Sequence, residues 1–251
     1  MNTVRLVDET STPQHSAPLN YTQLTSIPLF TGISGEDLAI IMDRVELLDV
    51  ELQPGETFVR EGDVCHCMAI VKDGKIARTQ TRHAGLFVNS RKQECPISYQ
   101  VTETLMPPVI LEPEVLFGLD LRHKNTWTAS TTCHLTLISK EDIRQTLMYV
   151  PIWRINFINL LCTDLQRSIS ERQSRVTPDH KRLVTEFLLK HCSHRGDTLS
   201  LDITIEQLGY CLGVNRRTLA GLLDDLQEQG LIEKHKQKFL VPSIEALRAI
   251  S

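Results

Sequence analysis

The 251-residue sequence has no apolar run long enough to cross a membrane, and its first residues, MNTVRLVDETSTPQ, lack the hydrophobic core of a signal peptide. It has no glycine-rich phosphate loop, no nucleophile elbow and no His or carboxylate set at catalytic spacing. Positive charge is not in excess, because 27 Lys and Arg stand against 31 Asp and Glu, a net charge of −4. These absences predict a cytoplasmic protein with no membrane partner, which is neither an enzyme nor a general polycation.

Disulfide bonds are not expected to stabilise the fold. The seven cysteines are an odd number and are scattered, so in a reducing compartment most of them are small apolar core residues. The close pair Cys65 and Cys67 has C-x-C spacing, which is not that of a strong zinc motif. We therefore predict no metal site and leave a redox role for this pair open.

The most informative segment is ITIEQLGYCLGVNRRTLAGLLDDL, residues 203–226, which predicts two short helices joined by a turn at Gly213. Thr204 can cap the first helix, and Gln207 completes a capping box. Asn215 is a favoured cap for the second helix. Apolar residues recur at helical spacing in both halves, which predicts a helix-turn-helix.

The residues outside these apolar stripes are those expected to touch DNA. Arg216 and Arg217 open the second helix, and arginine suits the O6 and N7 acceptors of guanine. After Gly230 follow two strand-like runs around a basic turn, GLIEKHKQKFLVP, whose tip can contact phosphates. The predicted DNA-binding residues are Thr204, Asn215, Arg216, Arg217, Thr218, Lys234, Lys236 and Lys238. An ordinary helical hairpin with solvated charges is the alternative, and residues 177–251 do balance ten basic against ten acidic residues.

The front half predicts many short strands. From Val45 to Ser139, β-type runs alternate with turn signals such as Pro54-Gly55 and Asp73-Gly74, which favours a small antiparallel barrel or roll. Residues 83–94 are polar and are expected to form the end of a hairpin. Residues 1–20 have no pattern and predict a mobile arm, and Ser34 can cap a helix that follows it.

A long helix is predicted over residues 151–174, begun by Pro151 and followed by a hinge at 174–178. Its apolar residues follow spacings of 3, 4, 3 and 4, which is a heptad seam. The seam consists of Ile155, Ile158, Cys162, Leu165 and Ile169. We expect it to join two copies of the chain, although such a stripe could instead pack on its own roll.

Roll, heptad helix and winged helix-turn-helix, in this order, resemble the CRP/FNR family of bacterial transcription regulators over nearly everything after residue 21. LQPGETFVREGD with IVKDGKI, LFGLDLRHKNTWTASTTCHLTLIS and the helix-turn-helix segment carry the resemblance. It implies an α+β fold with an N-terminal double-stranded β-helix (a jelly-roll, cyclic-nucleotide-binding-like domain), a long dimerisation helix and a C-terminal winged helix-turn-helix. The expected limits are an arm at 1–20, a sensor roll at 21–145, a helix and hinge at 146–176 and a DNA-binding domain at 177–251.

The resemblance also implies a homodimer that binds a pseudo-palindromic promoter site and contacts RNA polymerase. In the second helix of the motif, Arg217 and Gly221 replace an acidic residue and an arginine that many members have, so the DNA site should differ from theirs. The alternative is a haem- or small-molecule-binding sensor, or an interaction module, whose DNA-binding activity has been lost. Gly221 and the neutral charge of the last domain favour this second hypothesis.

The resemblance implies cyclic AMP as effector, but the residues that would bind it differ in this chain. Cyclic-AMP-binding members use a Gly-Glu pair for ribose and an Arg-Ser pair for the phosphate, whereas this chain has Glu112-Pro113-Glu114 and Arg122-His123-Lys124. The acidic residues repel a phosphate, and proline lacks an N–H donor. We therefore expect an effector other than cyclic AMP. The candidate ligand-binding residues are Glu114, Arg122, His123, Lys124 and Ser168.

The resemblance also raises two other kinds of sensing, by an iron–sulfur cluster and by haem. An iron–sulfur branch uses N-terminal cysteines, and this chain has none before Cys65. Haem remains open as a cofactor, because His and Met side chains can ligate its iron. The possible axial ligands are His66, Met68, His83, His123 and Met148.

Overall fold

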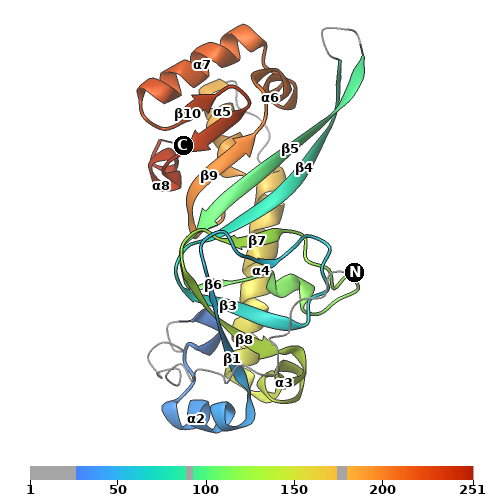
Figure 1. Ribbon diagram of the computed structural model, residues 1–251, viewed down its shortest axis with the longest axis vertical. Coiled ribbons are helices and arrows are strands. Elements are labelled where there is room, and N and C mark those ends of the chain that lie inside the picture. Colours follow the sequence, from blue (N-terminus) through green and yellow to red (C-terminus); the bar gives the residue numbers. More distant parts are fainter. Residues whose placement is uncertain (1–26, 89–92, 174–179, 251) are drawn as a thin grey trace.

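The computed structural model describes residues 27–88, 93–173 and 180–250. The predicted arm at 1–20 and the predicted hinge at 174–178 lie outside these residues. Within them, strands of the N-terminal half form a roll, a long helix runs beside the roll, and a small α/β unit follows at the other end of the molecule (Figure 1). This mixture of helices and antiparallel sheets confirms the α+β class predicted from the sequence.

Two antiparallel sheets form the roll. The first has the order β1-β8-β3-β6, with β1 at Leu47–Leu52, β8 at Cys133–Ser139, β3 at Cys67–Asp73 and β6 at Val109–Ile110. The second contains β2 (Thr57–Val59), β7 (Thr126–Ala129), β4 (Ile76–Val88) and β5 (Glu94–Leu105). Alternating apolar residues of both sheets meet in a core that includes Val71, Leu105, Trp127 and Leu135.

Helical segments cover one end of the roll. They are η1 (Pro28–Phe30), α2 (Gly35–Arg44), η2 (Pro113–Val115), α3 (Lys140–Gln145) and η3 (Leu147–Tyr149). The predicted cap of α2 is confirmed, since the Ser34 hydroxyl accepts a hydrogen bond from the backbone N–H of Asp37 at 3.1 Å.

The β4–β5 hairpin is longer than the sequence indicated. Residues 83–88, predicted to belong to the hairpin end, continue β4 instead, and β5 already begins at Glu94. β4 ends and β5 begins inside the range 83–94, so the position predicted for the hairpin end is confirmed and only the strands are longer. Along β5 the inward-facing residues Ile97, Tyr99 and Val101 alternate with polar ones. The hairpin therefore projects beyond the roll (Figure 1).

The C-terminal unit contains α5 (His180–Leu189), β9 (Gly196–Asp202), α6 (Ile205–Leu212), α7 (Arg216–Glu228), β10 (Glu233–His235), β11 (Lys238–Val241) and α8 (Ile244–Arg248). Strand β9, which the sequence analysis did not predict, pairs with β11 on one edge and with β5 on the other. One seven-stranded sheet, β10-β11-β9-β5-β4-β7-β2, therefore runs from the C-terminal unit into the roll.

Polar contacts reinforce this junction between β5 and β9. Glu103 of β5 is 1% exposed, and its carboxylate accepts hydrogen bonds from Arg78 (2.6 Å) and from the hydroxyl of Ser193 (2.8 Å). A Cβ added to Gly196 would clash with the Glu103 carboxylate and with Cδ1 of Ile244, so a side chain at this position would displace these buried groups. Lys75 and Asp197 form a further ion pair at 2.7 Å.

The long helix α4 (Pro151–Gln173) begins at Pro151 as predicted. One side of it packs on the roll, where Trp153 is fully buried and stacks on Phe157 with ring centroids 5.3 Å apart. The Asn156 amide also donates to the Thr31 carbonyl at 2.8 Å. None of the helices within the described residues is long and apolar enough to span a membrane.

Candidate DNA-binding surface

The first helix of the motif, α6, has the predicted caps at both ends. Thr204 and Gln207 exchange hydrogen bonds as a capping box, with Gln207 N–H to the Thr204 hydroxyl at 3.2 Å. Gly213 ends the helix with φ of 67°, a conformation that favours glycine. A Cβ on Gly209 would lie 2.8 Å from the Val214 carbonyl oxygen. The absence of a side chain at 209 therefore lets the turn close against α6.

The second helix, α7, presents the predicted arginines to solvent. The Asn215 side chain caps it by accepting from the backbone N–H of Thr218 at 2.9 Å. Leu219, Leu223 and Leu226 are buried against the rest of the domain. Arg216 and Arg217 are exposed at the first turn, and neither forms an ion pair with any residue that the structure describes. Two unpaired guanidinium groups thus stand on the outer side of the helix.

The predicted wing is the hairpin of β10 and β11, with Glu233 opposite Leu240 and His235 opposite Lys238. Its lysines differ in their partners. Lys234 forms an ion pair with Asp224 of α7, which ties the wing to the second helix. Lys236 lies exposed at the tip and has no ion pair among the described residues. Lys238 pairs with Asp202 at 3.8 Å, so of the three wing lysines Lys236 is the one whose charge has no described counter-ion.

Comparison with known protein families identifies this unit. Residues 182–250 match the model of the Crp-like helix-turn-helix domain. Residues 182–250 therefore form a Crp-like helix-turn-helix domain. This match favours the DNA-binding hypothesis over the alternative of a module without DNA activity. The assignment of individual DNA-contacting residues stays a prediction.

Solved structures of several regulators are similar to this chain at low identity. The catabolite activator protein of Thermus thermophilus is 17% identical, with 89% of this chain and 98% of that one covered and a TM-score of 0.41. DNR of Pseudomonas aeruginosa is 18% identical, with 92% and 96% covered and a TM-score of 0.40. CLP of Xanthomonas campestris, described as a c-di-GMP responsive global regulator, is 15% identical, with 83% and 99% covered and a TM-score of 0.44. No curated protein matches the sequence significantly.

The candidate ligand residues do not converge on one pocket. The Arg122 guanidinium donates to the Gly62 carbonyl at 2.8 Å, and Lys124 forms an ion pair with Asp120. Glu114 lines a cavity beside α4. The side chain of Ser168 lies outside the described residues. Four of the five predicted residues are thus described, and they point to different partners.

A buried carboxylate, that of Glu112, lies at the centre of this region and bonds to two of the predicted ligand residues, His123 and Lys124. Glu112 is 4% exposed and accepts hydrogen bonds from four donors: Nδ1 of His123 (2.7 Å), the backbone N–H of Lys124 (2.8 Å), Nδ2 of Asn125 (2.6 Å) and Nε1 of Trp127 (3.0 Å). Its backbone has φ of 41°, in the left-handed region that non-glycine residues rarely adopt.

The pKa values of Glu112 and His123 favour an ion pair between these two side chains. Burial alone would raise the pKa of Glu112, but its hydrogen bonds, first of all that from His123, lower the pKa below its ordinary value. Burial opposes the charge of His123, yet hydrogen bonding to Cys65 and Glu112 raises the pKa of its imidazole to about 9. At neutral pH the pair is therefore an imidazolium and a carboxylate.

The possible haem ligands are dispersed. Met68 lies on β3 and is 1% exposed. His66 and His83 are exposed, and Met148 is half-buried. Within residues 27–88, 93–173 and 180–250, no three His, Cys, Asp or Glu side chains gather as a metal-binding group. The Cys65 thiol donates to the Cys67 carbonyl at 3.4 Å, and burial raises the pKa of the Cys67 thiol to about 11, which disfavours its thiolate.

Proposed function

We propose that this protein is a homodimeric transcription regulator that binds a pseudo-palindromic promoter site through α7 of each protomer, contacts RNA polymerase there, and responds to an effector other than cyclic AMP. The proposal rests on the guanidinium groups of Arg216 and Arg217. Both are exposed on the first turn of α7 and form no ion pair within the described residues. That turn is the part of a recognition helix that reaches base edges in the major groove.

Dimerisation through α4 is supported by the two apolar faces of this helix. Trp153 and Phe157 are buried against the roll. On other faces of the same helix, Ile155 is 54% exposed, Ile158 is 46% exposed and Leu165 is 60% exposed. Large aliphatic side chains at heptad spacing are rarely left in water, so a second copy of α4 is the expected partner.

Replacing Ile155 and Ile158 by Glu is expected to convert the dimer to a monomer, because two carboxylates would enter the apolar seam. Affinity for a palindromic site should then fall by about 10²–10⁴-fold, since the second half-site no longer adds its binding energy. Light scattering and DNA-binding anisotropy measure the two effects. Glu at Ile40, which is 55% exposed on α2, serves as the control. An undiminished dimer in the double variant would contradict the α4 interface.

The proposal that cyclic AMP is not the effector rests on Glu112. The family resemblance places a cyclic phosphate beside His123 and Lys124, and the Glu112 carboxylate accepts hydrogen bonds from both. An entering phosphate would have to displace a buried carboxylate and would stand next to its negative charge. The Glu112 carboxylate thus already occupies the hydrogen-bond donors that a phosphate would need.

We expect no saturable binding of cyclic AMP by the purified protein in calorimetry at millimolar nucleotide. Glu112→Gln should behave in the same way, because the amide still fills the site. Glu112→Gly removes the carboxylate and suits the positive φ. It should bind formate, which a rise in melting temperature with formate concentration would report. Saturable cyclic-AMP binding by the unaltered protein would overturn this part of the proposal.

A further inference from the structure

The β4–β5 hairpin supplies part of the core of the C-terminal unit. Ile97, Tyr99 and Val101 of β5 lie in the same buried cluster as residues of α5, β9 and α7. The strand β5 also pairs with β9 along one edge. Nearer the tip of the hairpin, the Phe87 ring lies 5.4 Å from the ring of Tyr210 on α6. The C-terminal unit is therefore docked on the hairpin through an apolar face as well as through strand pairing.

A histidine just after α5, His191, is buried in this docking face. It is 6% exposed, and its ring stands almost at right angles to the rings of Tyr99 (5.8 Å, 81°) and Phe187 (5.1 Å, 82°). Its Nε2 lies 3.3 Å from the Tyr99 hydroxyl, whereas Nδ1 is buried without a hydrogen-bond partner among the residues that the structure describes. A protonated imidazole carries an N–H on both nitrogens, so it would bury the N–H at Nδ1 without an acceptor.

Two cations make a further positive charge on His191 unfavourable. Arg82 of β4 is paired with Tyr99 of β5, so both side chains lie on the face of the hairpin that His191 contacts. Lys190 directly precedes His191 in the chain, and neither Arg82 nor Lys190 forms an ion pair with a described residue. Burial, followed by the charges of Arg82 and Lys190, lowers the pKa of His191 to about 3, and Arg78 acts in the same direction. The ring is therefore neutral in the docked structure.

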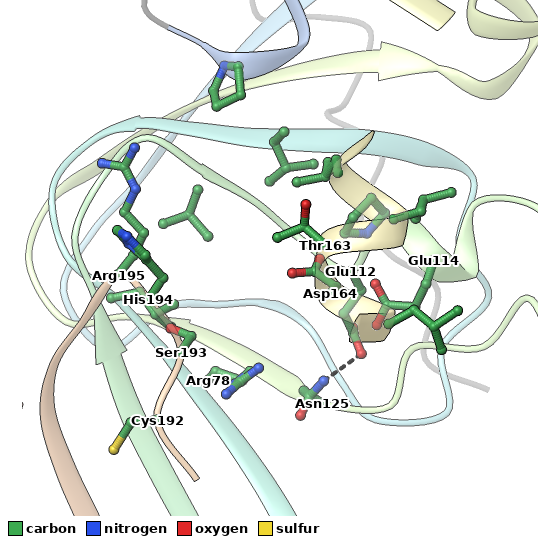
Figure 2. A pocket seen from close by; sticks show the side chains of 18 of the residues that line it. Arg78, Glu112, Glu114, Asn125, Thr163, Asp164, Cys192, Ser193, His194 and Arg195 are labelled. Atoms are coloured by element: carbon green, nitrogen blue, oxygen red, sulfur yellow. Dashed lines mark hydrogen bonds between the residues drawn. The ribbon is translucent and has the colours of Figure 1, made fainter. Parts of the chain in front are cut away.

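The carboxylates on the elements around His191 are engaged by other cations. The pairs are Glu103 with Arg78 on the hairpin, Glu186 with Arg182 on α5, and Asp197 with Lys75 and Asp202 with Lys238 at β9. The turn 193–195, which follows His191, lines a cavity whose carboxylates lie on the opposite side, at Glu112, Glu114 and Asp164 (Figure 2). The other groups that can titrate here are the Tyr99 phenol and the thiols of Cys192 and Cys211, and burial raises the pKa values of Tyr99, to about 12, and of Cys211. A protonated His191 would thus face cations and neutral groups.

We propose that His191 is a proton-sensitive latch between the β4–β5 hairpin and the C-terminal unit, and that the docking of these two parts weakens in mild acid. Only the undocked form exposes the imidazole to water, so only that form takes up the proton readily. Docking therefore has its full stability above about pH 6.5, the ordinary pKa of histidine, and loses stability as the pH falls from 6.5 towards 3. The equilibrium constant for undocking should rise about tenfold between pH 7.5 and pH 5.5. An effect on DNA binding rests on the proposed function, whereas the undocking does not.

Hydrogen exchange of the full chain without DNA measures the undocking, with exchange times corrected for the intrinsic effect of pH. From pH 7.5 to pH 5.5, amides of β9 and of the part of β5 that pairs with it should lose about tenfold in protection, while β3 and β8 keep theirs. His191→Gln should remove this pH dependence. His235→Gln, at an exposed histidine of the same unit, should retain it. Equal protection of β9 at both pH values in the unaltered protein, or the same tenfold loss in His191→Gln, would rule out the latch.

The charge of the ring can be measured in the unaltered protein, which keeps the test valid if His191→Gln fails to fold. In protein labelled with ¹³Cε1-histidine, the His191 signal is recognised by its contacts with the rings of Tyr99 and Phe187. It should keep the chemical shift of neutral imidazole from pH 7.5 to pH 5.5.

A His191 signal that titrates near pH 6.5 while β9 stays protected would mean that the docked form accepts the proton, and the latch would be refuted. DNA affinity separates this proposal from the proposed function. If β9 opens in acid and DNA affinity is the same at both pH values, the latch stands and its docking does not control DNA binding. Absence of selective DNA binding at pH 7.5, with the acid-induced opening intact, would contradict the proposed function alone.

Discussion

Replacing both Arg216 and Arg217 by Ala is expected to abolish sequence-selective DNA binding and to leave the fold unchanged. Both side chains are exposed and have no ion pair within the described chain, so their loss removes no internal contact. A bidentate arginine–guanine contact contributes about 1–3 kcal/mol of discrimination. The pair should therefore lower the affinity for the selected site by roughly 30-fold to 10⁴-fold, measured by anisotropy at fixed salt.

The wing offers a matched comparison for this result. Lys236→Ala also removes one exposed positive charge from the C-terminal unit, but at the tip of the β10–β11 hairpin. It should weaken binding to all sequences alike and reduce the slope of log affinity against log salt by about one. If the arginine variant also loses affinity uniformly, with selectivity retained, Arg216 and Arg217 are phosphate contacts and another part of α7 reads the bases.

Replacing Tyr99 by Ala is expected to destabilise the C-terminal unit, although Tyr99 belongs to a strand of the roll. It is 6% exposed, and its ring lies 6.2 Å from that of Phe187 and 5.8 Å from that of His191. Truncation of such a buried aromatic side chain costs about 3–5 kcal/mol, through lost burial and the cavity left behind. Because its neighbours lie on and just after α5, the loss should appear there.

Hydrogen exchange measures where the stability is lost. In Tyr99→Ala, amides of α5 and β9 should exchange faster, while those of β3 and β8 in the roll should keep their protection. Gln100→Ala is the control, since Gln100 is the next residue on the same strand and its side chain is exposed on the opposite face. Equal loss of protection in β3 and β8 would mean that the hairpin stabilises the roll rather than the C-terminal unit.

The helix-turn-helix could be predicted from the sequence because its signals are local. The Thr204–Gln207 capping box, the turn at Gly213 and the cap at Asn215 each involve residues within a few positions of one another, and all are present in the structure. The β5–β9 pairing could not be predicted in this way. It joins residues about a hundred positions apart, such as Gln100 and Asp202, and no local pattern specifies that register.

The Glu112 cluster illustrates a second limit. The sequence identified Glu112 and His123 as departures from a phosphate pocket, but it did not indicate that the two bond to each other. That contact depends on the left-handed backbone at Glu112 and on donors brought from a later strand, Trp127 of β7 among them. The position of a side chain within a loop is decided by three-dimensional packing, which periodicity does not report.

The sheet shared by β5 and β9 also bears on the order in which the chain folds as it is synthesised. Strand β5 leaves the ribosome about ninety residues before β9, and its inward-facing Ile97, Tyr99 and Val101 have no cover until the C-terminal unit is complete. During that interval the nascent hairpin exposes both an apolar face and an open strand edge, which are the features that promote aggregation and recruit chaperones. Completion of the C-terminal unit is thus also the step that covers the exposed strand of the roll.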